Sequence, residues 1–244
     1  MKVIAHRGAC KAAPQNTIPA FKTALEMGAD GFENDVHLTK DGVLVICHNY
    51  DIDETSNGKG LIADYTFEEL RKFDFGSYFS EEFTNTRIPA LDEFLELCSG
   101  VSVINVEIKT PQNGSTEIAE KVIDKVKEFG LLDNLIISCF NKDILLACKQ
   151  ADSTVKTGFL YSTDCPYKEV YDDPVAFAKK IKADALHPLG ILVDEEYIEN
   201  CHEAGLIVNP WTIDKPHAIE WLLNWDCDGV ITNYPDIARE IVDK

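Results

Sequence analysis

Two apolar segments of the chain each carry acidic residues at alternate positions. Glu33 and Asp35 lie in the segment GFENDVHLT, and Glu107 lies in the segment VINVEIKT. Because successive side chains of a strand point to opposite faces, these acids share one face and the apolar residues share the other. A half-buried strand usually turns its apolar face inward. Here we expect the reverse, with the acids facing the interior and the apolar residues facing a layer of helices.

Glu33, Asp35 and Glu107 are candidate ligands of a divalent cation. Three carboxylates in one pocket repel one another by several kcal/mol unless one is protonated or a cation lies among them. All the donor atoms are oxygen, which favours Mg²⁺ or Ca²⁺ over zinc. The alternative is a buried salt-bridge network without metal, in which Arg7 and Lys109 balance the acids.

Two histidines are candidate general acid and base residues. His6 follows the apolar segment KVIA, and His48 lies in VLVICHNY after the short turn Lys40–Gly42. A turn of that length connects antiparallel neighbours, and pairing positions that sum to about 82 or 83 sets His48 beside Asn34 or Asp35. Imidazoles change protonation near neutral pH. The sequence therefore predicts a histidine on each side of the acidic group.

Arg7 and Lys109 stand at the same strand ends as the acids. In so acidic a chain, two cations at this place predict an anionic ligand, and a phosphate fits a guanidinium fork, an ammonium and a metal together. Gly8 would let the backbone approach closely. The residues thus favour a phosphodiester, which gains negative charge in the transition state.

The elements that must position these residues alternate between short apolar strands and helices. Eight strand–helix units without a G-x-G-x-x-G turn favour an α/β fold of the (β/α)₈ TIM-barrel type over a doubly wound sheet. We expect one domain over residues 1–244. The predicted strands are 2–6, 31–38, 102–109, 135–140, 156–161, 184–188, 206–213 and 229–232. The predicted helices are 17–27, 91–98, 116–129, 142–150, 172–182, 194–203, 215–224 and 235–243.

Residues 43–50 form an extra strand, predicted to make a β-hairpin with the second barrel strand. Residues 51–90 are then predicted to form a small inserted cap over the barrel. Within it, Thr66 and Glu69 are spaced as a helix capping box, which predicts the start of a short helix. Loops at the carboxyl ends of barrel strands build active sites. The insertion is therefore a candidate lid or substrate wall.

The net charge, the cysteines and the apolar runs of the chain limit the partners and the location that we expect. Forty-two acidic against 23 basic residues give a net charge of −19, which disfavours nucleic acid and anionic membrane surfaces. Eight cysteines without a C-x-x-C pair are interpreted as reduced thiols of a cytoplasmic protein. No apolar run reaches the length of a membrane span, and we expect no stable membrane association.

Several motifs resemble those of the glycerophosphodiester phosphodiesterase family. They are HRG (6–8), NT (16–17), ENDVHLTKDGVLVICHN (33–49), IPALDE (88–93), VEIK (106–109), WT (211–212) and DGVITNYPD (228–236). The resemblance implies a barrel with a cap and hydrolysis of glycerophosphodiesters to glycerol 3-phosphate and an alcohol. It assigns Glu33, Asp35 and Glu107 to one metal ion and His6 and His48 to catalysis.

The sequence departs from the family pattern at five positions around these motifs. Gln15 and Asn49 replace acids, Asp214 and Asn233 stand where asparagine and aspartate are usual, and Glu54 stands where arginine is frequent. No proposed metal ligand or catalytic histidine is lost. The departures leave the preferred alcohol open.

The sequence thus predicts a metal-dependent phosphodiesterase with a small-molecule substrate. Arg7, Lys109 and Trp211 are predicted to bind it, with Trp211 lining the glycerol pocket or else serving as a core aromatic. Two alternatives remain: a lysophospholipase D-like enzyme with a lipid-like substrate, and a non-catalytic barrel that binds phosphate esters. Attack by water and attack by the substrate's own hydroxyl through a cyclic phosphate both stay open.

Overall fold

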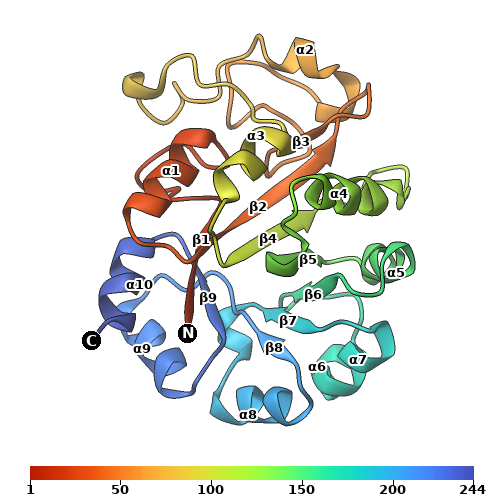
Figure 1. The fold of residues 1–244 in the computed structure, drawn as a ribbon, viewed down its shortest axis with the longest axis vertical. Helices are drawn as coiled ribbons and strands as arrows, with labels where there is room; N and C mark the ends of the chain where they lie inside the picture. The colour runs from red at the N-terminus through yellow and green to blue at the C-terminus, as the bar shows by residue number, and fades with distance from the viewer.

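A sheet of eight parallel strands curves into a nearly closed barrel in the computed structural model, which describes residues 1–244 (Figure 1). The strands run around it in the order β8-β7-β6-β5-β4-β2-β1-β9. The predicted (β/α)₈ fold is confirmed. The barrel strands are β1 (Lys2–His6), β2 (Gly31–Leu38), β4 (Val103–Ile108), β5 (Leu135–Cys139), β6 (Lys156–Tyr161), β7 (Ala185–Pro188), β8 (Ile207–Val208) and β9 (Gly229–Thr232).

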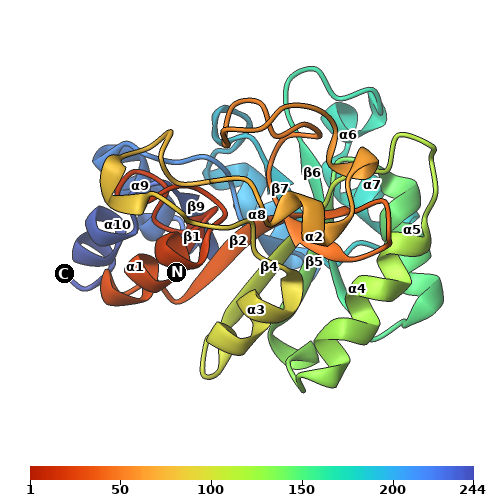
Figure 2. The ribbon, with the colours of Figure 1, turned by 90° about the horizontal axis from the view of Figure 1, so that it is seen from above.

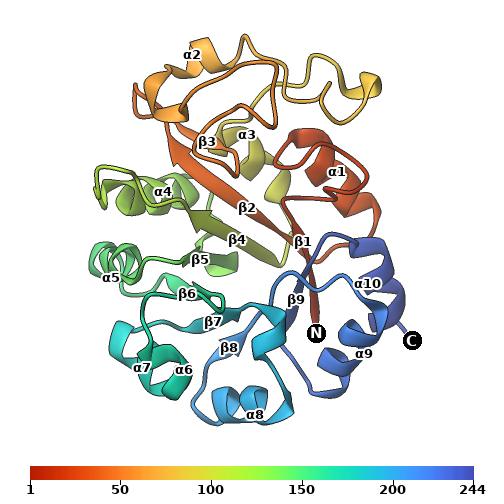
Figure 3. The same cartoon turned by 180° about the vertical axis from the view of Figure 1, so that it is seen from behind.

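Helices lie around the outside of the strands (Figures 1 and 3). They are amphipathic, as α4 illustrates by burying Ile118, Val122 and Val126 at helical spacing. The helices are α1 (Ile18–Glu26), α3 (Leu91–Leu95), α4 (Glu117–Glu128), α5 (Lys142–Ala151), α6 (Glu169–Asp172), α7 (Pro174–Ile181), α8 (Glu195–Glu203), α9 (Pro216–Asn224) and α10 (Pro235–Val242). Short 3₁₀ turns η3 (Glu96–Cys98), η4 (Leu132–Asn134) and η5 (Gly190–Leu192) complete the outer layer.

The helix predicted over 172–182 is present as α7, and a short helix, α6, precedes it. α6 ends at Asp172, and the Asp173 side chain accepts a hydrogen bond from the backbone N–H of Ala176, 2.8 Å away. Pro174 occupies the first position of α7, where its missing N–H costs nothing. The proline and its aspartate cap start a new helix at this point.

The main core fills the space between strands and helices, as the alternation predicts. Phe32 of β2 is fully buried on the helix side, where Phe21 of α1 and Phe94 of α3 meet it edge to face. The ring centroids of Phe21 and Phe94 are 4.6 Å apart. These contacts fix the outer face of β2, and with it the inward direction of the acids on the other face.

The strand predicted over 206–213 is much shorter than expected. β8 has two residues, because Pro210 has no N–H with which to continue the ladder. The following segment still closes the barrel against β9. Backbone bonds of 3.0 Å run from the Ile213 N–H to the Ile231 carbonyl and from the Ile231 N–H to the Pro210 carbonyl.

The predicted hairpin is present, but its second strand is shorter than the predicted 43–50. β3 (Leu44–Ile46) pairs antiparallel with β2, and Val36 lies opposite Ile46. The Asp41 carboxylate accepts hydrogen bonds from the Thr39 hydroxyl (2.6 Å) and from the Phe67 N–H (3.0 Å). The second bond ties the turn of the hairpin to the segment that follows it.

Residues 51–90 lie beside the hairpin at one end of the barrel (Figures 1 and 2). They contain η1 (Ile62–Asp64), α2 (Phe67–Leu70) and η2 (Glu81–Phe83), and both bonds of the Thr66–Glu69 capping box are present. A separate small core consists of Val45, Cys47, Ile52, Ile62, Leu70, Phe75 and Ile88. The insertion is thus held by its own apolar contacts with the hairpin.

All eight cysteines are free, and seven of them are buried. No helix has the length and apolar character required to cross a bilayer.

Candidate active site

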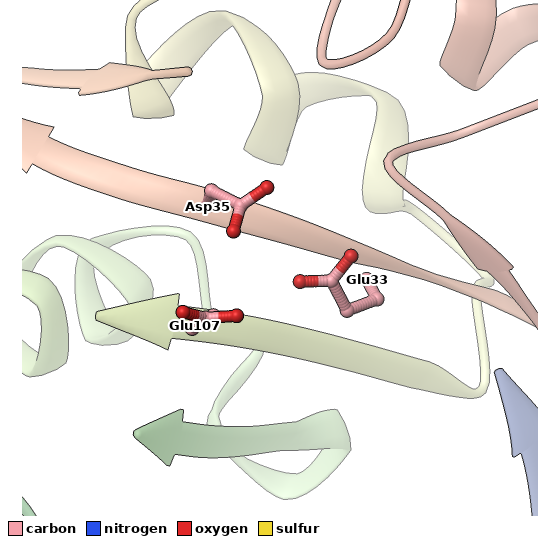
Figure 4. Close-up of side chains that lie close together, drawn as sticks. All are labelled: Glu33, Asp35 and Glu107. Carbon is pink, nitrogen blue, oxygen red and sulfur yellow. The ribbon is translucent and has the colours of Figure 1, made fainter. Parts of the chain in front are cut away.

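Three carboxylates meet inside the barrel. Glu33 and Asp35 project from β2 and Glu107 from β4, where the parallel register places Asp35 beside Glu107. Figure 4 shows the three side chains turned toward one another across the two strands. One oxygen of each lies within 4.8 Å of the others, and all three residues are buried. The predicted convergence of these acids is present in the structure.

Lys109 and Arg7 supply the positive charge nearest to the acids. The Lys109 ammonium lies 2.7 Å from Asp35 Oδ1 and 2.5 Å from Glu107 Oε1. Arg7 Nε lies 3.5 Å from Asp35 Oδ2, and the Arg7 backbone N–H donates to Glu33 Oε2 over 3.1 Å. Two cations therefore face three carboxylates, which leaves one negative charge without a counterion.

Burial and mutual repulsion set the pKa values of the acids apart. Burial, followed by the Asp35 and Glu107 charges, raises the pKa of Glu33 well above its usual range. Burial likewise raises the pKa of Glu107, to about 7, although Lys109 opposes the change. Burial would raise the pKa of Asp35 too, but Lys109 and Arg7 hold it well below its usual range. Asp35 is the ionised centre of the group.

The turn after β1 brings Arg7 over the acids. Arg7 and Gly8 both have left-handed backbone, with φ of 57° and 76°. A Cβ on Gly8 would lie 2.7 Å from the backbone of Ala20 in α1, so only glycine fits there. The close approach expected at Gly8 is therefore to a helix of the same chain.

Two residues of the next loop hold this arrangement in place. Gln15 accepts a hydrogen bond from Arg7 Nη1 over 2.7 Å, and Asn16 Nδ2 donates to Asp35 Oδ2 over 2.7 Å. Asn16 is buried with left-handed backbone, φ 57°. Sequence reasoning gave Asn16 no role. The NT motif was its only signal.

His6 lies at the end of β1, beside Glu33. Its Nδ1 is 2.7 Å from Asn233 Oδ1, and its Nε2 is 3.9 Å from Glu33 Oε2. Asn233 in turn donates from Nδ2 to Asp214 Oδ2 over 2.7 Å, so its oxygen faces His6 and Nδ1 must carry the hydrogen. Burial and the Arg7 charge lower the pKa of His6 to about 4. The resting imidazole is neutral, with the Nε2 lone pair toward the acids.

His48 repeats this arrangement on the hairpin. Its Nδ1 is 2.7 Å from Asn49 Oδ1, and Asn49 Nδ2 donates to Glu54 Oε2 over 2.9 Å. Burial, with the Lys109 and Arg7 charges and against the Asp35 charge, lowers the pKa of His48. Because Asn49 donates through Nδ2 to Glu54, its oxygen faces His48, so His48 Nδ1 carries the hydrogen and Nε2 is free. Each histidine is thus oriented by an asparagine that a carboxylate anchors.

Four of the five departures from the family pattern are therefore paired with one another in space. Asp214 bonds to Asn233, Glu54 bonds to Asn49, and Gln15 bonds to Arg7. Sequence reasoning noted all of them as separate changes. Two changes that occur in the same sequence, such as Asn233 and Asp214, can indicate that the two side chains contact each other.

Trp211 lies further around the barrel rim and is half-buried. Its Nε1–H donates to the His187 carbonyl over 2.7 Å, and its ring meets Phe140 edge to face at 5.6 Å. These contacts hold the indole without making it part of the main core. No contact joins it to the acidic group.

At the carboxyl ends of the barrel strands, the structure thus gathers a carboxylate group, two cations and two neutral histidines with free Nε2 atoms. Such a set can bind a cation and an anion together and can move protons beside them. A phosphodiester is a ligand with the matching charge.

Comparison with known proteins agrees with this chemistry. The family model described as "Glycerophosphoryl diester phosphodiesterase family" matches residues 6–237. A glycerophosphodiester phosphodiesterase of Caldanaerobacter subterraneus subsp. tengcongensis is 40% identical over 243 residues, covering 99% of this chain and 98% of that protein. A glycerophosphodiester phosphodiesterase of Bacillus altitudinis is 35% identical, with 98% and 97% covered.

Solved structures give the same result. A phosphodiesterase of Oleispira antarctica, in complex with the product sn-glycerol-3-phosphate, has a TM-score of 0.90 and 27% identity, covering 100% of this chain and 97% of that one. The Thermotoga maritima glycerophosphodiester phosphodiesterase has a TM-score of 0.80 and 28% identity, with 99% and 98% covered. The chain therefore belongs to the glycerophosphoryl diester phosphodiesterase family, and it is a phosphodiesterase.

Proposed function

We propose that this enzyme hydrolyses glycerophosphodiesters to glycerol 3-phosphate and an alcohol, with one divalent cation held by Glu33, Asp35 and Glu107. The observation that carries the proposal is the meeting of three buried carboxylates within 4.8 Å at the carboxyl ends of parallel barrel strands. The sn-glycerol-3-phosphate product of the Oleispira antarctica relative supports the glycerol part of the substrate. The proposal treats residues 1–244 as one catalytic domain.

The residues present fit a hard cation. All three donors are carboxylate oxygens, and the group has one negative charge more than Arg7 and Lys109 balance, which suits Mg²⁺ or Ca²⁺. When bound, the cation would polarise a phosphate oxygen and stabilise charge that develops on it. Lys109 and Arg7 would then bind the remaining phosphate oxygens, and Trp211 would line the glycerol pocket.

His6 and His48 would move the protons. One Nε2 takes the proton of the attacking hydroxyl as that oxygen bonds to phosphorus. The other imidazole, protonated in the substrate complex, donates a proton to the alcohol oxygen as its bond to phosphorus breaks. The Nδ1–H bonds to Asn233 and Asn49 keep each ring oriented through both transfers. The attacking hydroxyl belongs either to water or to the substrate's glycerol.

Neither alternative function gains support. The aromatic side chains of the insertion are mostly used in packing: Phe75 is in its small core, and Phe67 and Phe73 pack against that core. This leaves Tyr78 and Phe79 as its large exposed apolar side chains, too few for a lipid-binding lip. The relatives named above are phosphodiesterases, which argues against a binding-only barrel.

We also propose a reducing, cytoplasmic location, since eight free cysteines suit a compartment in which thiols stay reduced.

Turnover of glycerophosphocholine tests the proposed function directly. We expect release of glycerol 3-phosphate in the presence of Mg²⁺ or Ca²⁺, and loss of turnover by about 10² or more after chelation, because no cation is then present to polarise the phosphate and stabilise its developing charge. Adding the ion back should restore activity. Full activity in excess chelator would contradict the metal dependence.

Glu107→Gln should weaken cation binding and stabilise the cation-free fold. The folded-state pKa of Glu107, about 7 against an ordinary 4.5, means that its favourable contribution is complete below pH 4.5 and is lost as the pH rises through 7. With chelator, the variant should exceed the wild type in melting temperature by little at pH 5 and by roughly 4–8 °C at pH 8, on the order of 2 kcal/mol.

Glu120→Gln, at an exposed position of α4, is the control, and it should show no such pH trend. Added Mg²⁺ or Ca²⁺ should raise the melting temperature of the wild type more than that of Glu107→Gln. A difference between Glu107→Gln and wild type that stays constant from pH 5 to 8 would show that burial does not raise the pKa of Glu107.

His6→Ala and His48→Ala should each lower kcat by roughly 10² to 10⁴ with little change in metal affinity. The double variant should lose far less than the product of the two single losses, because each proton transfer depends on the other. kcat/KM of the wild type should follow a bell-shaped pH curve. The exposed His217→Ala serves as the matched control. Wild-type turnover in His48→Ala would limit the hairpin to a supporting role.

A further inference from the structure

A groove of about 550 Å³ opens beside the acidic group and has no part in the mechanism above. It lies between the tip of the β2–β3 hairpin, the 61–63 segment of the insertion and the loop that leads into α4. Figure 1 shows the end of β2, whose last residues His37 and Leu38 line the groove, close to α4. Its walls thus come from three separate parts of the chain, including the insertion.

The charge of the groove is opposite to that of the protein. Lys40, Lys109 and Lys121 line it, against a single acid, Glu117, in a chain with a net charge of −19. Lys40 and Lys121 are exposed, and neither ammonium lies within 4.0 Å of a carboxylate. Lys121 Nζ lies 3.7 Å from the position of a Cβ built on Gly42, at the hairpin turn. Two free ammonium groups therefore stand near the same turn.

Lys109 is the residue that the groove shares with the proposed reaction centre. That side chain lines the groove, while its ammonium lies 2.7 Å from Asp35. Tyr50 holds the two walls together: its hydroxyl donates to the Thr110 carbonyl over 3.0 Å, and its ring meets His37 edge to face at 5.1 Å. A ligand with its phosphate beside Lys109 would therefore have this groove, with Lys40 and Lys121 in its lining, next to it.

We propose that this groove binds the alcohol portion of the diester and selects alcohols that carry an anionic group, a carboxylate or a phosphate. The inference rests on the proposed function. Attraction between the two free ammonium groups and such an anion is partly screened by salt, since both are close to solvent. The selectivity should therefore be of moderate size and should decrease with ionic strength.

The test compares two glycerophosphodiesters of matched shape, the glycolate ester and its neutral glycolamide counterpart. At about 20 mM salt, we expect kcat/KM to favour glycolate by about tenfold, and the preference to fall to about twofold at 500 mM. The Lys40→Gln/Lys121→Gln variant should lose the preference and keep wild-type turnover of the glycolamide ester. A third glycerophosphodiester, whose alcohol portion is itself glycerol 3-phosphate, carries a phosphate in place of the carboxylate. Comparing it with the glycolate ester shows which of the two anions the groove favours.

Lys156→Gln is the matched control, because Lys156 is exposed at the opposite, amino end of β6. It should retain the full preference. Equal kcat/KM for the two esters in the wild type, or a preference that survives in the double lysine variant, would overturn the inference while leaving the proposed function intact.

Calorimetric binding of both esters separates the two proposals further. If neither ester is hydrolysed, the proposed function fails, and the groove is then judged by affinity. Tighter binding of glycolate that depends on Lys40 and Lys121 supports the groove. Equal affinity of the two esters, or no binding, refutes it.

Discussion

Three carboxylates buried inside a barrel must be balanced by positive charge, and much of the local structure serves that requirement. Asp35, for example, accepts a hydrogen bond from Asn16 and forms ion pairs with Lys109 and Arg7. The register of β2 against β4 is part of the same constraint, because a slip by one residue would turn Asp35 toward the apolar helix layer. The aromatic contacts of Phe32 on the outer face oppose such a slip.

The two histidines show a second consequence of this charge. An aspartate hydrogen-bonded to His6 or His48 would add another negative group to a site that already has an excess. In this chain each histidine meets a neutral asparagine oxygen, and the carboxylates of Asp214 and Glu54 lie one residue further away. The asparagines fix the tautomer without contributing charge, and burial lowers the pKa of both rings so that they are neutral at rest.

Much of the fold was predictable from local pattern. Alternation in the segments of β2 and β4 identified both the strands and the inward face, and the short turn gave the hairpin register in which Val36 meets Ile46. Prediction failed where one proline decided the outcome. Pro210 shortened β8 to two residues.

The site was predictable only for side chains that alternation or a strand end could place. Glu33, Asp35 and Glu107 converge as expected. Asn16 and the asparagine partners of the histidines lie in loops, whose path no periodicity specifies. Their contacts depend on left-handed turns at Arg7 and Asn16 and on segments more than 200 residues apart, as in the bond between His6 and Asn233.

A crystal structure of the protein soaked in Mg²⁺ or Ca²⁺ tests the central claim, the shared cation of Glu33, Asp35 and Glu107, most directly. We expect one ion with an oxygen of each carboxylate at about 2.0 to 2.6 Å, and Lys109 still beside Asp35. An ion bound elsewhere, with these three carboxylates more than about 6 Å apart and so beyond any shared coordination, would contradict it.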